Sequence, residues 1–157
     1  MNRGEYMKKF LTVMMISTFT FAGTTATLNL RGTVGQVVDI SLVAESDAQS
    51  LDLSSTTSDK KVATVTEQSN SNVGYSVTVS SDNSGKLVHS NGDTFDYVLK
   101  YGGVDAELSS GGKTFSRSTS GLVSDNFDAT VSYTGKSAAT MVSGQYDDVV
   151  TFTISAN

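Results

Sequence analysis

The chain has 157 residues and a formal net charge of −5 at pH 7, and it contains 24 Ser, 20 Thr and 14 Gly but no Cys, Pro or Trp. The lack of Cys excludes disulfides, thiolate zinc sites and iron–sulfur clusters, and a single His leaves little room for general-base chemistry. Only 17% of the residues are charged, and the net charge is negative, which argues against a nucleic-acid partner. The composition favours an exported β protein.

Residues 1–26 have the pattern of an export signal. The basic pair Lys8-Lys9 precedes a short apolar run, residues 10–22, and small residues lead to a cleavage site after Ala26. The run is shorter and richer in hydroxyl groups than a membrane-spanning helix requires. An uncleaved anchor is the alternative, and translation could start at Met1 or at Met7. We expect export through the general route and a soluble mature protein.

Apolar and polar residues alternate repeatedly along the mature chain, and no window shows helical spacing. This period of two predicts strands, because successive side chains of a strand point to opposite faces. The predicted strands cover residues 28–34, 38–42, 51–53, 62–67, 75–79, 87–89, 95–101, 104–108, 113–117, 127–133 and 146–155.

Turn residues separate these segments. Asn91-Gly92 is a strong hairpin signal, since both residues tolerate a positive φ, and Gly102-Gly103 and Ser110-Gly111-Gly112 indicate further tight turns. Asp82-Asn83-Ser84-Gly85 is another predicted turn. Many short strands at this spacing, without a repeat or linker, predict a single all-β domain with an antiparallel sandwich or barrel.

Both ends of the mature chain are alternating segments, Thr27–Val34 and Tyr146–Ile154. A sandwich that begins and ends in this way is expected to expose backbone donors and an apolar groove to a partner strand. Eight extended residues span roughly 27 Å, about the length of one sandwich strand. The N-terminal segment therefore either pairs within its own sheet or is donated to another copy.

Candidate catalytic and metal-binding residues are few. His89 is the only conventional base, and its place beside a predicted hairpin turn favours an exposed residue over a member of a hydrolase triad. The acidic pairs Asp93/Asp96, Asp125/Asp128 and Asp147/Asp148 lack the ligand count of a calcium loop. We therefore expect no catalysis, no cofactor and no metal. The alternative function is a self-complete secreted β-sandwich that binds carbohydrate or calcium as a monomer.

Three segments carry a resemblance to a known family. The ending Ser143-Gly144-Gln145-Tyr146-Asp147-Asp148-Val149-Val150-Thr151-Phe152-Thr153-Ile154 resembles the Gly-x-Tyr-x-Asp-x-Val-x-Val close of fimbrial subunits from chaperone–usher systems. The middle, from Tyr97-Val98-Leu99-Lys100-Tyr101-Gly102-Gly103 to Lys113-Thr114-Phe115, looks like that of CS1/CFA-type major pilins. The opening Leu28-Asn29-Leu30-Arg31-Gly32-Thr33-Val34 is similar to a pilin donor strand.

The resemblance implies an incomplete immunoglobulin-like β-sandwich that lacks its last strand. Residues 1–26 would be the signal peptide, 27–36 the N-terminal donor strand and 37–157 the pilin-like domain. The strand would be supplied first by a periplasmic chaperone and then by the next subunit, with assembly at an outer-membrane usher into a homopolymeric surface fimbria that supports adhesion.

The resemblance also implies roles for individual residues. The donor residues would be Leu28, Leu30, Gly32 and Val34, and the residues lining the groove and contacting the chaperone would be Tyr146, Val150, Phe152 and Ile154. The sequence departs from many pilins in having no disulfide, and it has Ser155-Ala156-Asn157 where some chaperones contact a near-terminal aromatic residue.

Overall fold

Among the described residues, strands form over most of the segments in which apolar and polar residues alternate. The computed structural model describes residues 23–157, and the predicted signal peptide, residues 1–26, lies almost wholly outside them. The strands are β1 (Val38–Ala44), β2 (Thr57–Ser69), β3 (Tyr75–Ser81), β4 (Lys86–His89), β5 (Thr94–Asp96), β6 (Val98–Tyr101), β7 (Val104–Asp105), β8 (Lys113–Arg117), β9 (Val123–Tyr133), β10 (Tyr146–Asp147) and β11 (Val150–Ala156). Three short 3₁₀ helices lie between them, η1 (Ser46–Gln49), η2 (Leu108–Ser110) and η3 (Ala138–Thr140). No helix in this part of the chain is long and apolar enough to cross a membrane.

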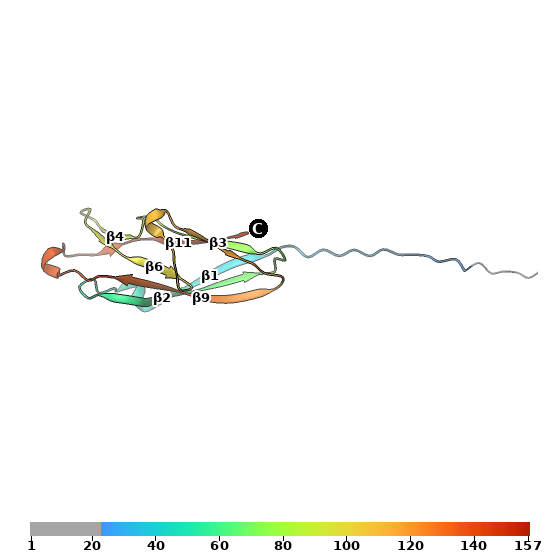
Figure 1. Ribbon diagram of the computed structural model, residues 1–157, viewed down its shortest axis with the longest axis horizontal. Coiled ribbons are helices and arrows are strands. Elements are labelled where there is room, and N and C mark those ends of the chain that lie inside the picture. Colours follow the sequence, from blue (N-terminus) through green and yellow to red (C-terminus); the bar gives the residue numbers. More distant parts are fainter. Residues whose placement is uncertain (1–22) are drawn as a thin grey trace, which may run out of the picture. The chain divides into compact units, whose positions relative to one another are not determined.

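Residues 34–157 fold as an all-β antiparallel sandwich of two layers (Figure 1). One layer has the strand order β1-β2-β9-β6-β7, and the other is built from the ladders β10-β4-β5 and β11-β3-β8. The core lies between the layers and consists of inward-facing side chains from both. Its buried members are Ala63, Val65, Tyr75, Val77, Val79, Phe95, Leu99, Tyr101, Ala106, Leu108, Phe115, Ala129, Val131 and Tyr133.

The second layer contains one long strand pair with an interruption in the middle. The pairing runs from Tyr75 opposite Ala156 to His89 opposite Tyr146, so β3 and β4 point in the same direction, as do β10 and β11. The turn predicted at residues 82–85 is present, with a positive φ at Ser84, but it does not reverse the chain. It is an insertion between β3 and β4.

The segment from Phe95 to Tyr101 is not the single strand that its alternation predicts. It breaks at Tyr97, because β5 pairs with β4 in one layer and β6 pairs with β9 in the other. Phe95, Leu99 and Tyr101 are nevertheless all buried. A chain that crosses between layers can keep the same inward residues, so its alternation alone does not reveal the crossing.

The strand predicted at residues 51–53 was also wrong. The carboxylate of Asp52 accepts hydrogen bonds from the Ser54 backbone N–H (3.0 Å), the Ser54 hydroxyl (2.6 Å) and the Ser55 hydroxyl (2.7 Å). These bonds close an Asx-type turn. They also lower the pKa of Asp52, with the two serine hydroxyls contributing most.

Two predicted tight turns connect neighbouring strands of a layer. Gly92, with φ +94°, lies in the turn that joins β4 to β5, and Gly102 and Gly103, with φ +58° and +80°, join β6 to β7. The strand predicted over residues 104–108 is shorter than expected, because β7 has only two residues and Leu108 begins η2.

Candidate functional site

Along one side of the sandwich, the two layers end in the strands β1 and β11, whose outer backbone edges have no partner in the part of the chain that the structure describes. Among residues 23–157, β1 pairs only with β2, and β11 pairs only with β3. The two edge strands lie side by side, with several pairs of their Cα atoms within 8 Å, but no ladder joins them. Residues 38–44 and 150–156 are referred to below as the open edge. Such an edge presents free N–H and C=O groups to an added strand.

The inward side chains of β11 are less well covered than those of its neighbour. Val77 and Val79 of β3 are fully buried, whereas Val150, Phe152 and Ile154 are only half-buried and pack against the rim of the core. The Phe152 ring makes a T-shaped contact with Tyr101, at 5.3 Å between the ring centroids. The open edge therefore leaves apolar surface that an added strand could cover. They are three of the four residues that the family resemblance assigned to the groove.

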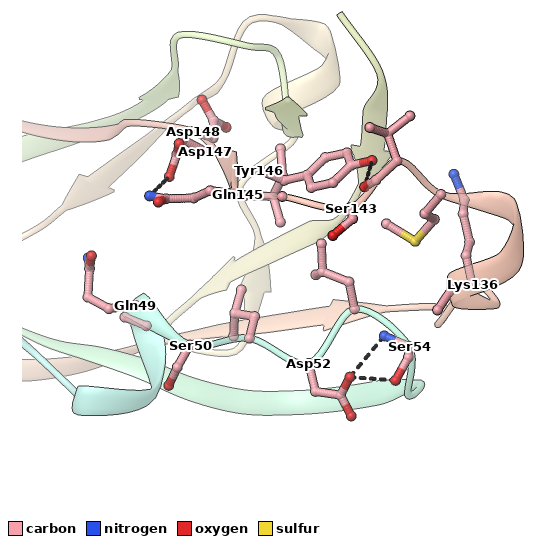
Figure 2. A pocket seen from close by; sticks show the side chains of 18 residues that line it. Gln49, Ser50, Asp52, Ser54, Lys136, Ser143, Gln145, Tyr146, Asp147 and Asp148 are labelled. Carbon is pink, nitrogen blue, oxygen red and sulfur yellow. Dashed lines mark hydrogen bonds between the residues drawn. The ribbon is translucent and has the colours of Figure 1, made fainter. Parts of the chain in front are cut away.

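A cavity of about 440 Å³ lies beside the open edge, between the segment that follows β1 and the segment that precedes β11. Figure 2 shows Gln49, Ser50, Asp52 and Ser54 on one side of it and Ser143, Gln145, Tyr146, Asp147 and Asp148 on the other. Its apolar lining comes from Leu51, Leu53, Leu87, Met141 and Val142.

Tyr146, the fourth predicted groove residue, lies on the wall of this cavity rather than on β11. It belongs to β10, where it pairs with His89, and their rings lie 5.0 Å apart between centroids. Its hydroxyl donates a hydrogen bond to the Val142 carbonyl oxygen (3.0 Å), within the loop that closes the cavity (Figure 2). The structure thus places the predicted groove residues on two neighbouring surfaces.

Asp148 holds the interrupted strand pair together between β10 and β11. Its carboxylate accepts hydrogen bonds from the hydroxyls of Ser81 and Tyr97, both at 2.6 Å, and from the backbone N–H groups of Asn83 (3.1 Å) and Val149 (2.8 Å). Burial and the bond to this carboxylate raise the pKa of Tyr97. Asp148 therefore fixes where the last strand resumes and directs β11 along the open edge.

We expect Asp148→Ala to lower the free energy of unfolding by about 3 kcal/mol, because it leaves partly buried hydroxyl and N–H donors without an acceptor. Chemical denaturation followed by far-UV circular dichroism measures the loss. Asp147→Ala is the matched control, since that exposed carboxylate accepts a bond only from Gln145 (2.7 Å), and its cost should stay below about 1 kcal/mol. Equal losses in the two variants would contradict this role for Asp148.

The predicted donor segment contains no strand in the structure. The structure assigns no strand to residues 23–37, and β1 begins at Val38. Leu28, Leu30 and Val34 are 80%, 86% and 90% exposed, which is unusual for three large apolar side chains in alternation. Gly32 has no atom outside its chain neighbours within 4 Å of the position of a Cβ.

A buried polar cluster, which the sequence analysis missed, lies beneath the open edge near the start of β1. Glu67, on β2 opposite Ile40, is fully buried and accepts hydrogen bonds from Arg117 (3.0 Å, through both Nε and Nη2), from the Tyr75 hydroxyl (2.7 Å) and from the Tyr101 hydroxyl. Burial alone would raise the pKa of Glu67, but the bonds from Arg117, Tyr101 and Tyr75 outweigh it, and the pKa is lowered. Glu67 occupies an inward position of an alternating strand. A charged residue at such a position was the sequence signal that could have revealed the buried polar cluster.

The remaining chemical candidates are separate from one another. His89 is partly exposed at the β4–β5 hairpin, and its Nδ1 is 2.7 Å from the Asn91 side-chain oxygen. Within residues 23–157, no three His, Cys, Asp or Glu side chains come together in an arrangement that could hold a metal ion.

No protein-family model matches the sequence, and no curated protein sequence matches it either.

Proposed function

We propose that this chain is a structural subunit of a surface fimbria and that it assembles by donor-strand complementation, as chaperone–usher pilins do. The observation that carries the proposal is the open edge of β11, with its half-buried row Val150, Phe152 and Ile154, in a chain that also has an unpaired alternating segment. The edge supplies unpaired backbone groups and apolar surface, and the segment supplies matching groups at the same period.

The strand order supports an immunoglobulin-like reading of the sandwich. Constant-type immunoglobulin domains have the order A-B-E-D in one sheet and place strands C, F and G in the other. The order β1-β2-β9-β6 corresponds to A-B-E-D, and β3 and β11 then correspond to C and F. In this correspondence, strand G would pair with the outer edge of β11, which has no partner among residues 23–157. The donor segment of another copy would take this place.

An incoming strand requires a local adjustment. A strand placed between two others needs about 9.6 Å between them, twice the usual inter-strand spacing, whereas several Cα atoms of β1 and β11 are within 8 Å. β1 must therefore move outward when a strand pairs with β11. Its inward side chains Val38 and Ile40 are only half-buried, so this movement uncovers little core.

The proposed route follows from export. The signal peptide would direct the chain to the periplasm, where a chaperone would supply a temporary strand to the open edge. An outer-membrane usher would then exchange that strand for residues 27–34 of the next copy, and the resulting homopolymer would be displayed on the cell surface and support adhesion. No catalytic step or cofactor is part of this proposal.

Deletion of residues 27–34 tests the proposal. With the periplasmic chaperone present, the deletion variant should still fold and accept a strand, but it should form no polymer, because the donor is gone. The wild-type chain should give SDS-resistant ladders that collapse on boiling, as completed sheets dissociate slowly. A wild-type protein that stays monomeric, or a deletion that unfolds the domain, would support a self-complete sandwich instead.

A further inference from the structure

One end of the sandwich carries exposed apolar side chains from three different loops. Val37 precedes β1, Val73 lies between β2 and β3, and Leu122 lies between β8 and β9. They are 58%, 62% and 88% exposed. Because β1 and β3 begin at this end and β11 finishes there, with the Asn157 N–H bonded to the Gly74 carbonyl oxygen, it is referred to below as the entry end.

The chain is fastened to the sandwich at the entry end just before β1. The Asn70 side chain donates to the Gly35 carbonyl oxygen (2.9 Å) and accepts from the Val37 N–H (2.7 Å), and the Asn70 backbone N–H donates to the Val37 carbonyl oxygen (3.1 Å). The Gln36 amide donates to the hydroxyl of Ser71 (2.9 Å), which is buried. The chain is thus held from Gly35 onward, directly after the donor residue Val34, so the last two residues of the predicted donor strand, 35 and 36, are hydrogen-bonded to their own domain.

This fastening begins one residue after Val34, so a single peptide bond separates the last donor residue from the hydrogen-bonded part of its own domain. Consecutive Cα atoms are about 3.8 Å apart, so an inserted Val34 would keep Gly35, and with it the entry end, within a few Å of the accepting copy. Every ladder of the sandwich is antiparallel, and an added strand antiparallel to β11 runs away from the entry end of the accepting copy. Val34 would therefore emerge at the opposite end, next to the cavity.

We infer that the entry end is an interface for a second copy of this chain, and that in the fibre it packs against the opposite end of that copy, near residues 48–54 and 138–145. The inference rests on the proposed strand exchange and adds a second contact to it. Val37, Val73 and Leu122 are covered in this contact, which accounts for three exposed apolar side chains gathered where the donor segment leaves the domain. The hydrogen bonds of the Asn70 side chain to Gly35 and Val37 position the two domains end to end.

The reactivity of a single introduced thiol tests the interface, because the chain has no Cys of its own. Leu122→Cys is suitable, since an 88% exposed side chain contributes little to folding. The rate of maleimide labelling is measured in the monomeric and the SDS-resistant fractions of one preparation. We expect labelling to be at least ~10-fold slower in the fibre, because the thiol is then covered by the next copy.

Val104→Cys is the matched control. Val104 is also an exposed apolar residue, but it lies on β7, paired opposite Tyr101 and away from both ends of the sandwich, so its labelling rate should be the same in both fractions. Equal labelling of Leu122→Cys in monomer and fibre would overturn the end-to-end contact while leaving strand exchange in place. A wild-type chain without any SDS-resistant fraction would overturn the proposed function, and this inference with it.

Discussion

Replacing Glu67 with alanine is expected to lower the free energy of unfolding by about 3–5 kcal/mol, the usual cost of removing one partner from a buried ion pair. The carboxylate is the common acceptor for Arg117, Tyr75 and Tyr101, whose side chains come from three different strands. Its loss leaves Arg117, whose side chain is only 22% exposed, and two phenolic hydroxyls without their acceptor. A domain of this size has a total stability of about 5–15 kcal/mol, so the loss is a large fraction of the total.

An exposed ion pair provides the matched control for Glu67. Asp96 and Lys86 approach to 2.6 Å, with side chains 70% and 45% exposed, and such pairs contribute at most about 1 kcal/mol. Asp96→Ala should therefore shift the urea midpoint only slightly, whereas Glu67→Ala should shift it strongly. If both variants denature at the same urea concentration, the buried cluster does not stabilise the fold in the way described.

The Glu67 cluster also predicts how stability changes with pH. The pKa of Glu67 is lower in the folded state than the ordinary value of 4.5. Its contribution to stability is therefore complete above pH 4.5 and is lost as the pH falls through the lowered folded pKa. Glu67→Gln, which cannot titrate, should be less stable than wild type at pH 7, and the difference should shrink below pH 4.5. Thermal unfolding at a series of pH values measures this difference.

The fold was largely predictable because alternation directly reports which side chains face the core. The segments at 75–79 and 113–117 are strands, and the residues that their alternation turns inward, such as Val77 and Phe115, are buried. The breaks at Tyr97 and Asp148 were not predictable in this way. A strand that changes partner, or that resumes after an insertion, keeps its period of two and gives no local sign of the break.

The residues that shape the candidate site were harder to predict than its apolar row. Alternation alone places Val150, Phe152 and Ile154 on one face of a strand, and the family resemblance supplied their expected role at a groove. The roles of Glu67 and Asn70 could not be predicted from alternation. The groups that their side chains bond lie 33 or more residues away along the sequence, as Arg117 does from Glu67. The exception is Tyr75, which is eight residues from Glu67. Only the pairing of strands brings such groups together, so a sequence pattern can mark a charged inward residue as unusual but cannot name its partners.

Substitutions on the two faces of the donor segment should have different effects on polymerisation. Replacing Leu28, Leu30 and Val34 together with threonine retains the β-propensity of the segment but removes its apolar face. Burial of each side chain in an acceptor is worth roughly 1.5 kcal/mol or more, so the triple variant should lose about 4 kcal/mol of binding, a ~1000-fold weaker association. The SDS-resistant ladder should disappear, while the thermal unfolding of the monomer stays unchanged, since all three side chains are at least 80% exposed.

The alternation of the donor segment supplies the control for this variant. Asn29 and Arg31 lie on its opposite face, and replacing both with threonine introduces the same residue type without touching the apolar row of Leu28, Leu30 and Val34. This double variant should polymerise like the wild type, because an inserted strand turns that face to solvent. Equal loss of ladders in both variants would mean that the segment acts without a buried face, and intact ladders in the triple variant would mean that another part of the chain joins the copies. Only a face-selective loss agrees with a strand inserted at the open edge.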